Sequence, residues 1–257
     1  MKIFKWSQWK TAALAFVLLL SIMLTGGTLA YFTDSREETS VFTAGNVYIT
    51  LTEAEVKADA VGNLVEDPSK DRMQGAELGA EEAIKDYGKI YPGQTIYKDP
   101  TITNTGDDGA WIAAKVVITD GRGDIHKLMG YYGVDAIDFE VLLQGGLLDE
   151  YIHVGVWNGI QNVCHNDNYA KVQVADRANG VYEFYFFMLK AAQKGDEIVL
   201  FDTMSIEPEW DNAQMRELVD LKIKVQAFAV QTFGFESCFD AMKGAFATHF
   251  EKCVSNP

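Results

Sequence analysis

The residues of this chain that could support chemistry are few and widely spaced. Its four histidines, His126, His153, His165 and His249, have different neighbours, and no His-Glu-x-x-His motif joins any two of them. A zinc peptidase of the common type uses that motif to place both histidines on one face of a helix. The sequence also lacks a Gly-x-Ser-x-Gly elbow and a glycine-rich phosphate loop before a helix. We therefore expect that this protein is not an enzyme.

One short segment comes closest to a soft-metal site. Cys164-His165 is followed by Asn166 and Asp167, and His249 or Cys253 would be needed to complete a set of four ligands. A turn that holds an unpaired thiol explains the same residues without a metal. We favour the turn and predict no metal ligand and no cofactor.

The other two cysteines fall within a predicted C-terminal helix. Cys238 and Cys253 are fifteen residues apart, which corresponds to about 22 Å along a continuous helix. A disulfide requires Cα atoms within roughly 7 Å of each other. A bridge would therefore need Cys164 or a break in the helix.

Carboxylates on predicted turns are the candidates for binding a hard cation. Asp107-Asp108 forms one group, and Asp120 with Asp124 forms another. Calcium prefers such oxygen ligands, but neither spacing follows a defined calcium loop. We interpret these residues as solvated turns, with weak calcium binding as the alternative.

Composition narrows the class of protein and of partner. The 257 residues, 48% of them apolar, can form one sizeable globular domain. Asp and Glu number 37 against 22 Lys and Arg, so the net charge of −15 argues against a nucleic-acid partner. Three cysteines cannot provide a dense disulfide framework in a chain of this length. The domain must be stabilised by packing.

The first thirty residues have the pattern of an export signal. A lysine-containing start is followed by the apolar run TAALAFVLLLSIML at 11–24, which is shorter than the about 20 residues of a membrane span. Small residues at Thr28 and Ala30 predict cleavage between Ala30 and Tyr31. We interpret residues 1–30 as a signal peptide, with an uncleaved membrane anchor as the alternative. Cleavage removes three lysines and no acid, which leaves a mature charge of −18.

Short alternating segments dominate the mature chain. Residues 31–52 form an N-terminal segment and a first strand, in which Val47, Ile49 and Leu51 alternate; residues 53–88 read as an acidic surface insertion with a possible short helix at 76–87. Residues 89–257 form the remainder. Strand patterns occur there at 95–104, interrupted by Pro100, and at 110–119, 139–143, 152–157, 170–174, 181–189, 198–204 and 221–231. Asp-Gly turn chemistry at 105–109 predicts a hairpin between the first two.

These patterns predict an all-β sandwich or barrel, with one or two short peripheral helices. The run VYEFYFFML at 181–189 is apolar on both faces and belongs in the centre; 221–231 begins half-exposed and then enters the core. A short helix follows Asp211, its predicted N-cap. An amphipathic C-terminal helix spans 236–250, with Phe235, Phe239 and Phe246 on one face. Core packing is the favoured role of that face, and binding to a partner or a membrane surface is the alternative.

Three stretches resemble the TasA/camelysin family of secreted bacterial proteins. GGTLAYFTD at 26–34 with FTAGNV at 42–47 is similar to a signal and mature N-terminus processed by the SipW-type signal peptidase. YPGQ at 91–94 with KDP at 98–100 and NTG at 104–106 is similar to the first core hairpin of the family. LFDT at 200–203, EWDN at 209–212 and VQAFAVQ at 225–231 resemble its late strands in Clostridia-type members.

The resemblance implies a jelly-roll-like β-sandwich that is secreted to the matrix or cell surface of a Gram-positive bacterium. It implies self-assembly into biofilm fibres, in which residues 31–46 are donated as a strand to the next subunit. The donor side chains would be Tyr31, Phe32, Val41 and Phe42. The chain departs from TasA in its acidic insertion and its Phe-rich C-terminal stretch. Other matrix or anchoring proteins could be further partners, and the membrane is involved only through the uncleaved signal.

Three alternatives remain open at the level of sequence. Residues 31–46 could pair with their own sheet as an ordinary first strand instead of being donated. The camelysin side of the family has been classed as a metallopeptidase, so a secreted metalloendopeptidase is the runner-up, although the zinc motif is missing. A monomeric adhesion or wall-binding module is the third possibility.

Overall fold

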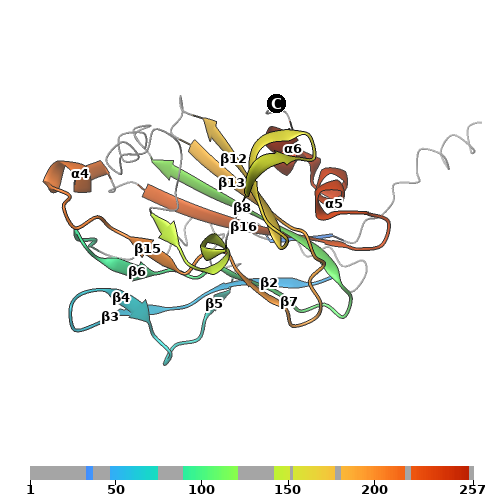
Figure 1. The fold of residues 1–257 in the computed structure, drawn as a ribbon. Coiled ribbons are helices and arrows are strands. Elements are labelled where there is room, and N and C mark those ends of the chain that lie inside the picture. The colour runs from blue at the N-terminus through green and yellow to red at the C-terminus, as the bar shows by residue number, and fades with distance from the viewer. Residues whose placement is uncertain are drawn as a thin grey trace, which may run out of the picture. The chain divides into compact units, whose positions relative to one another are not determined.

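Strands in three sheets form the framework of the described part of the chain (Figure 1). The computed structural model describes residues 33–36, 47–74, 89–120, 142–150, 153–176, 181–217 and 221–254. The largest sheet has seven strands in the order β1 (Thr33–Arg36), β16 (Leu221–Gln231), β8 (Ala110–Asp120), β13 (Val181–Met188), β12 (Tyr169–Asp176), β11 (Ile160–His165) and β10 (His153–Trp157). All neighbouring strands in it are antiparallel.

Two smaller sheets form the opposing layer. One has the order β14 (Glu197–Val199), β7 (Thr101–Asn104), β2 (Ile49–Glu53) and β5 (Met73–Gln74). The other has the order β3 (Val56–Ala58), β4 (Leu64–Glu66), β6 (Thr95–Tyr97), β15 (Thr203–Ser205) and β9 (Leu143–Gln144). A 3-10 helix, η2, spans Gly146–Asp149. The predicted all-β sandwich is confirmed.

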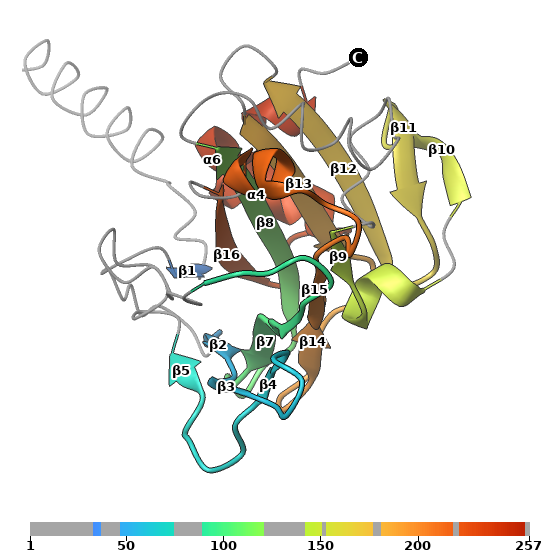
Figure 2. The ribbon, with the colours of Figure 1, turned by 90° about the vertical axis from the view of Figure 1, so that its left-hand side faces the viewer.

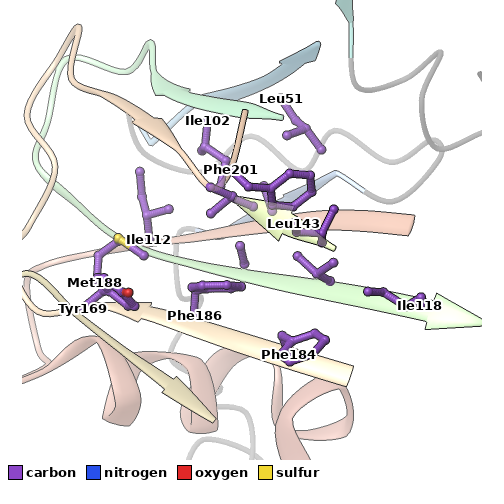
Figure 3. Close-up of a cluster of buried hydrophobic side chains, with 14 of the residues drawn as sticks. Leu51, Ile102, Ile112, Ile118, Leu143, Tyr169, Phe184, Phe186, Met188 and Phe201 are labelled. Atoms are coloured by element: carbon purple, nitrogen blue, oxygen red, sulfur yellow. The ribbon is translucent and has the colours of Figure 1, made fainter. Parts of the chain in front are cut away.

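Alternation along β13 explains why this strand lies at the centre of the molecule. Tyr182, Phe184 and Phe186 belong to the core between the sheets, whereas Tyr185 and Phe187 belong to a second core on the outer face. Figure 3 shows the inner core, where Leu51 and Ile102 of the smaller sheet lie above Ile112, Phe184 and Phe186. Both faces of the strand are covered, as its sequence predicts.

Two short helices cover the outer face of the seven-stranded sheet (Figure 1). They are α5 (Cys238–Ala245) and α6 (Ala247–Val254), so the predicted single helix at 236–250 is wrong, whereas its apolar packing on the sandwich is confirmed. The chain leaves helical geometry at Phe246 (φ −128°, ψ 39°). This break places the rings of Phe246 and Phe250 at 5.1 and 5.0 Å from that of Phe228. The separation of about 22 Å predicted for Cys238 and Cys253 assumed one continuous helix, so it does not apply to this structure.

A second helix prediction holds at the other end of the sheet. The short helix α4 (Asn212–Glu217) begins after Asp211, whose carboxylate accepts a hydrogen bond from the Ala213 amide at 2.7 Å. An N-cap side chain satisfies an amide that has no partner within the helix. Asp211 is the N-cap that the sequence predicts.

The predicted hairpin through residues 105–109 is wrong, because β7 and β8 belong to different sheets. Asn104 holds this connection. Its side-chain amide donates to the carbonyls of Asp108 (3.0 Å) and Ala192 (2.9 Å), and its oxygen accepts from the Gly106 amide (3.0 Å). The turn therefore carries the chain from one layer of the sandwich to the other.

The predicted strand at 198–204 is two strands in different sheets. β14 pairs with β7, and β15 pairs with β6, so the chain crosses between the two smaller sheets at residues 200–202. Next to it, residues 98–100 make the same crossing between β6 and β7. The Lys98 amide donates to the Asp202 carbonyl, and the Leu200 amide donates to the Pro100 carbonyl. Pro100, which cannot donate to a ladder, marks this crossing.

Several further boundaries differ from the sequence prediction. Of the predicted strand at 139–143, β9 contains only Leu143, and 139–141 lie outside the described residues. The segment read as an insertion contains the short strands β3, β4 and β5, and the possible helix at 76–87 also lies outside the described residues. β11, which carries Cys164 and His165, was not predicted.

Glu183 of β13 links the seven-stranded sheet to α6 through an ion pair with Lys252. Its carboxylate lies 3.0 Å from Lys115 Nζ and 3.1 Å from Lys252 Nζ, and it accepts a hydrogen bond from the Tyr185 hydroxyl at 2.8 Å. Burial alone would raise the pKa of Glu183, but the hydrogen bonds from Tyr185, Lys115 and Lys252 outweigh it and lower the pKa below the ordinary 4.5. The ionised carboxylate is therefore favoured in the folded state.

We expect Glu183→Gln to lower the free energy of unfolding at neutral pH by about 1–3 kcal/mol, because hydrogen bonds to a charged group are lost. A lowered folded pKa gives stability that is complete above the unfolded pKa and is lost as the pH falls through the folded value. The difference between wild type and variant should therefore shrink below about pH 4. Urea unfolding at neutral and acidic pH measures it. A difference that stays constant, or matches that of the exposed control Glu209→Gln, would contradict this role.

Candidate assembly edge at the N-terminal strand

The N-terminal strand β1 forms one edge of the seven-stranded sheet. It pairs antiparallel with β16, and Thr33 lies opposite Val230 and Arg36 opposite Ala227. The strand begins two residues after Tyr31, the first residue expected after signal cleavage. The element closest to the expected new terminus is therefore an edge strand.

β1 covers only part of its partner. β16 has eleven residues, of which β1 pairs with four, Ala227 to Val230. On its other side, all eleven residues of β16 pair with β8. Within the described residues, the stretch from Leu221 to Gln226 thus has β8 on one side and no strand on the other, and Lys222 and Lys224 are exposed there. Lysines on an open edge oppose unselective strand pairing.

The predicted cleavage and donor residues cannot be located. Ala30, Tyr31, Phe32, Val41 and Phe42 all lie outside the described residues. Of the segment 31–46, only Thr33–Arg36 is described, and these four residues pair with β16 of the same chain. This is the pairing expected of an ordinary first strand.

The predicted soft-metal residues occupy different elements. Cys164 and His165 lie in β11 and not in a turn, so that part of the interpretation is wrong; β11 pairs with both β10 and β12 there. His153 lies opposite His165. Asn166 forms the following turn and accepts hydrogen bonds from the amides of Asn168 and Tyr169. The strand was missed because its sequence IQNVCH lacks clear alternation.

The C-terminal histidine and cysteines pack in the outer core. The His249 ring lies 5.1 Å from that of Phe228, and Cys253 is buried within the same cluster. The Cys238 thiol donates to the Ile112 carbonyl at 3.1 Å, and burial raises the pKa of both Cys238 and Cys253. Both are free thiols. Across the described ranges, no three His, Cys, Asp or Glu side chains are grouped as a metal site would need.

The turn aspartates are also separated. Asp107 forms an exposed ion pair with Lys194, and Asp120 ends β8. Asp124 and His126 lie outside the described residues. The predicted pairing of Asp120 with Asp124 therefore lies outside the described residues, and weak calcium binding at Asp107 and Asp108 stays a prediction.

A small pocket lies between the sheets. It is lined by Lys171 and by apolar side chains that include Val116, Leu143 and Phe184. Its cavity volume of about 10 Å³ is enough for roughly one water molecule. A space of this volume is too small for an organic ligand, so surface features are the stronger candidates for function. In the part of the chain that is described, no helix is long and apolar enough to span a membrane.

Comparison with known proteins adds no relative. No protein-family model matches the chain, and searches of the curated proteins and of the solved structures find no significant match.

Proposed function

We propose that this protein is a secreted surface or biofilm matrix protein whose subunits assemble into fibres by exchanging their N-terminal strands. One observation carries the proposal: β1 lies two residues after the expected cleavage site and pairs at the open edge of the largest sheet. The resemblance of residues 26–47 to a SipW-type signal and mature N-terminus supports export and processing.

The pairing of β1 is suited to exchange between subunits. A strand of four residues makes few ladder hydrogen bonds, so it leaves β16 more easily than a long internal strand would. The same four residues can then pair with β16 of a second copy and recover equivalent contacts. Each subunit donates one strand and accepts one, which gives a head-to-tail contact that does not close and so produces filaments.

Cleavage would control when this exchange begins. Before cleavage, the donor segment follows residues 1–30, which consist of a start with three lysines and then an apolar run at 11–24. A donor strand held at the membrane by its signal cannot pass to another subunit. Export and cleavage after Ala30 would release it outside the cell, where the matrix forms.

Removal of residues 31–46 should abolish filaments while leaving the sandwich folded. The chains 31–257 and 47–257 are compared by negative-stain electron microscopy and sedimentation, with circular dichroism as the test of folding. We expect filaments only from 31–257, because the shorter chain keeps both cores but has no strand to exchange. Filaments from 47–257 would refute strand exchange, and the absence of filaments from both chains would favour a monomeric adhesion module.

A peptide control separates pairing from a general loss of stability. A synthetic peptide with the sequence of residues 31–46 should bind the 47–257 chain, because it fills the vacant edge of β16. A scrambled peptide of the same composition should not bind. Fluorescence anisotropy of the labelled peptides measures both. Equal binding of the two peptides would contradict a specific site on β16.

A further inference from the structure

The edge strand at the opposite end of the seven-stranded sheet exposes apolar side chains. β10 is the last strand of that sheet among the described residues (Figure 2). Val154 is 69% exposed and Val156 is 59% exposed. The two valines lie on one face of the strand, because side chains alternate along it. Exposed valines on an open edge strand are typical of a surface that another strand covers.

The two edges of the sheet differ in charge. β1 and the open part of β16 contain Asp34, Arg36, Lys222 and Lys224. β10 has the sequence HVGVW and contains no Asp, Glu, Lys or Arg, although the chain as a whole carries a charge of −15. Two copies of so acidic a protein repel each other across most of their surfaces. An uncharged edge strand is a place where a second copy can approach closely.

The sequence of β10 is complementary to itself. When two identical edge strands pair antiparallel, a two-fold axis relates them. A residue that lies a given number of positions before the axis in one strand is then opposite the residue that lies the same number of positions after it in the other. With Gly155 on that axis, Val154 of each copy lies opposite Val156 of the other. All four valines are then covered on one face of the joined sheet. No like charges are placed opposite each other within this register.

We propose that β10 is a symmetric docking site for a second copy of this chain, joined edge to edge about Gly155. The contact lies at the far edge of the sheet from β1 and uses no residue of the N-terminal segment. It links two subunits side by side, and within a fibre it would join neighbouring filaments laterally. It goes beyond the proposed strand exchange and holds whether or not that exchange occurs.

A single cysteine at the axis tests this symmetry. Opposed residues of an antiparallel pair have Cα atoms about 4.5–5.5 Å apart, within the range of a disulfide. Gly155 tolerates a side chain, because an added Cβ meets only His165 Nε2 at 3.4 Å. The mature chain 31–257 carries Gly155→Cys with Cys164→Ser, is oxidised with diamide and is analysed by denaturing electrophoresis without reductant. We expect disulfide-linked dimers, which this readout detects even in filaments.

The matched control is Val61→Cys in the same Cys164→Ser background, because Val61 is 83% exposed and lies between β3 and β4. Dimers should form at least about tenfold faster from the Gly155→Cys chain, since docking raises the effective concentration of the two thiols. Adding Val154→Lys and Val156→Lys should reduce that rate to the control value. Equal rates for the two cysteine variants, or a fast rate that the lysines leave unchanged, would overturn the proposal. Loss of filaments on removal of residues 31–46 is a separate result and does not bear on it.

Discussion

Lys98→Met is expected to lower the free energy of unfolding by about 3–5 kcal/mol, the usual cost of removing one partner of a buried ion pair. Lys98 Nζ lies 2.7 Å from Glu53 Oε2, and the two side chains are 7% and 2% exposed. Methionine keeps much of the length of lysine but removes the charge of Lys98 from beside the buried Glu53 carboxylate. Urea unfolding at neutral pH, followed by circular dichroism, measures the loss.

The pair has this effect because of where it lies. Glu53 ends β2, and Lys98 begins the crossing between β6 and β7. Next to it, the Asp99 carboxylate accepts from the Ala54 amide at 2.8 Å and lies 2.7 Å from Arg72 Nη1. These charges hold together two segments that leave their ladders at the same point. Backbone groups at this point are satisfied by these charged side chains: the Ala54 amide donates to the Asp99 carboxylate, and Arg72 donates to the Asp99 carbonyl.

The control is Lys57→Met, which breaks an ion pair with Asp67 near the end of β3. The Lys57 side chain is 52% exposed, so we expect a loss of no more than about 1 kcal/mol. The double variant Glu53→Gln/Lys98→Met should recover part of the loss, because no unbalanced charge remains. Equal losses for Lys98→Met and Lys57→Met would show that the buried pair contributes nothing beyond an exposed one.

The central strands could be predicted from sequence because the apolar pattern of each strand indicates which of its faces are buried. The run at 181–189 is apolar at both phases of its alternation, and β13 is covered on both faces. The run at 221–231 changes from alternating to apolar at 227–230, and β16 is buried from Gln226 to Val230. Periodicity reports which faces are covered, and that is a local property.

Pairing partners could not be predicted in the same way. The turn residues at 105–109 suggested a hairpin, yet Asn104 bonds to Ala192, a residue far along the chain. The phenylalanine spacing at 235–250 fits one helix, but the break at Phe246 allows both helices to lie on the sheet. In each case a long-range contact decided the outcome, and no local pattern contains it.

The same distinction between local pattern and long-range contact applies to the candidate sites. The sequence identified the mature N-terminal segment as the region to examine, and its part at Thr33–Arg36 is an edge strand. The run at 152–157 was predicted as a strand, but nothing in HVGVW indicates that it ends a sheet or that its valines are exposed. The position of a strand within a sheet depends on all its neighbours.

The central claim is that β1 must leave its own β16 for subunits to join, and a reversible lock tests it most directly. Thr33 and Val230 are opposed residues of β1 and β16, so cysteines at both positions fall within disulfide range. The mature Thr33→Cys/Val230→Cys chain is followed by electron microscopy when oxidised and again after reduction, with Val230→Cys alone as the control. We predict that the oxidised double variant forms no filaments, and that reduction restores the filaments that the control forms under both conditions. Filaments from the oxidised double variant, formed at the rate of the control, would contradict the account.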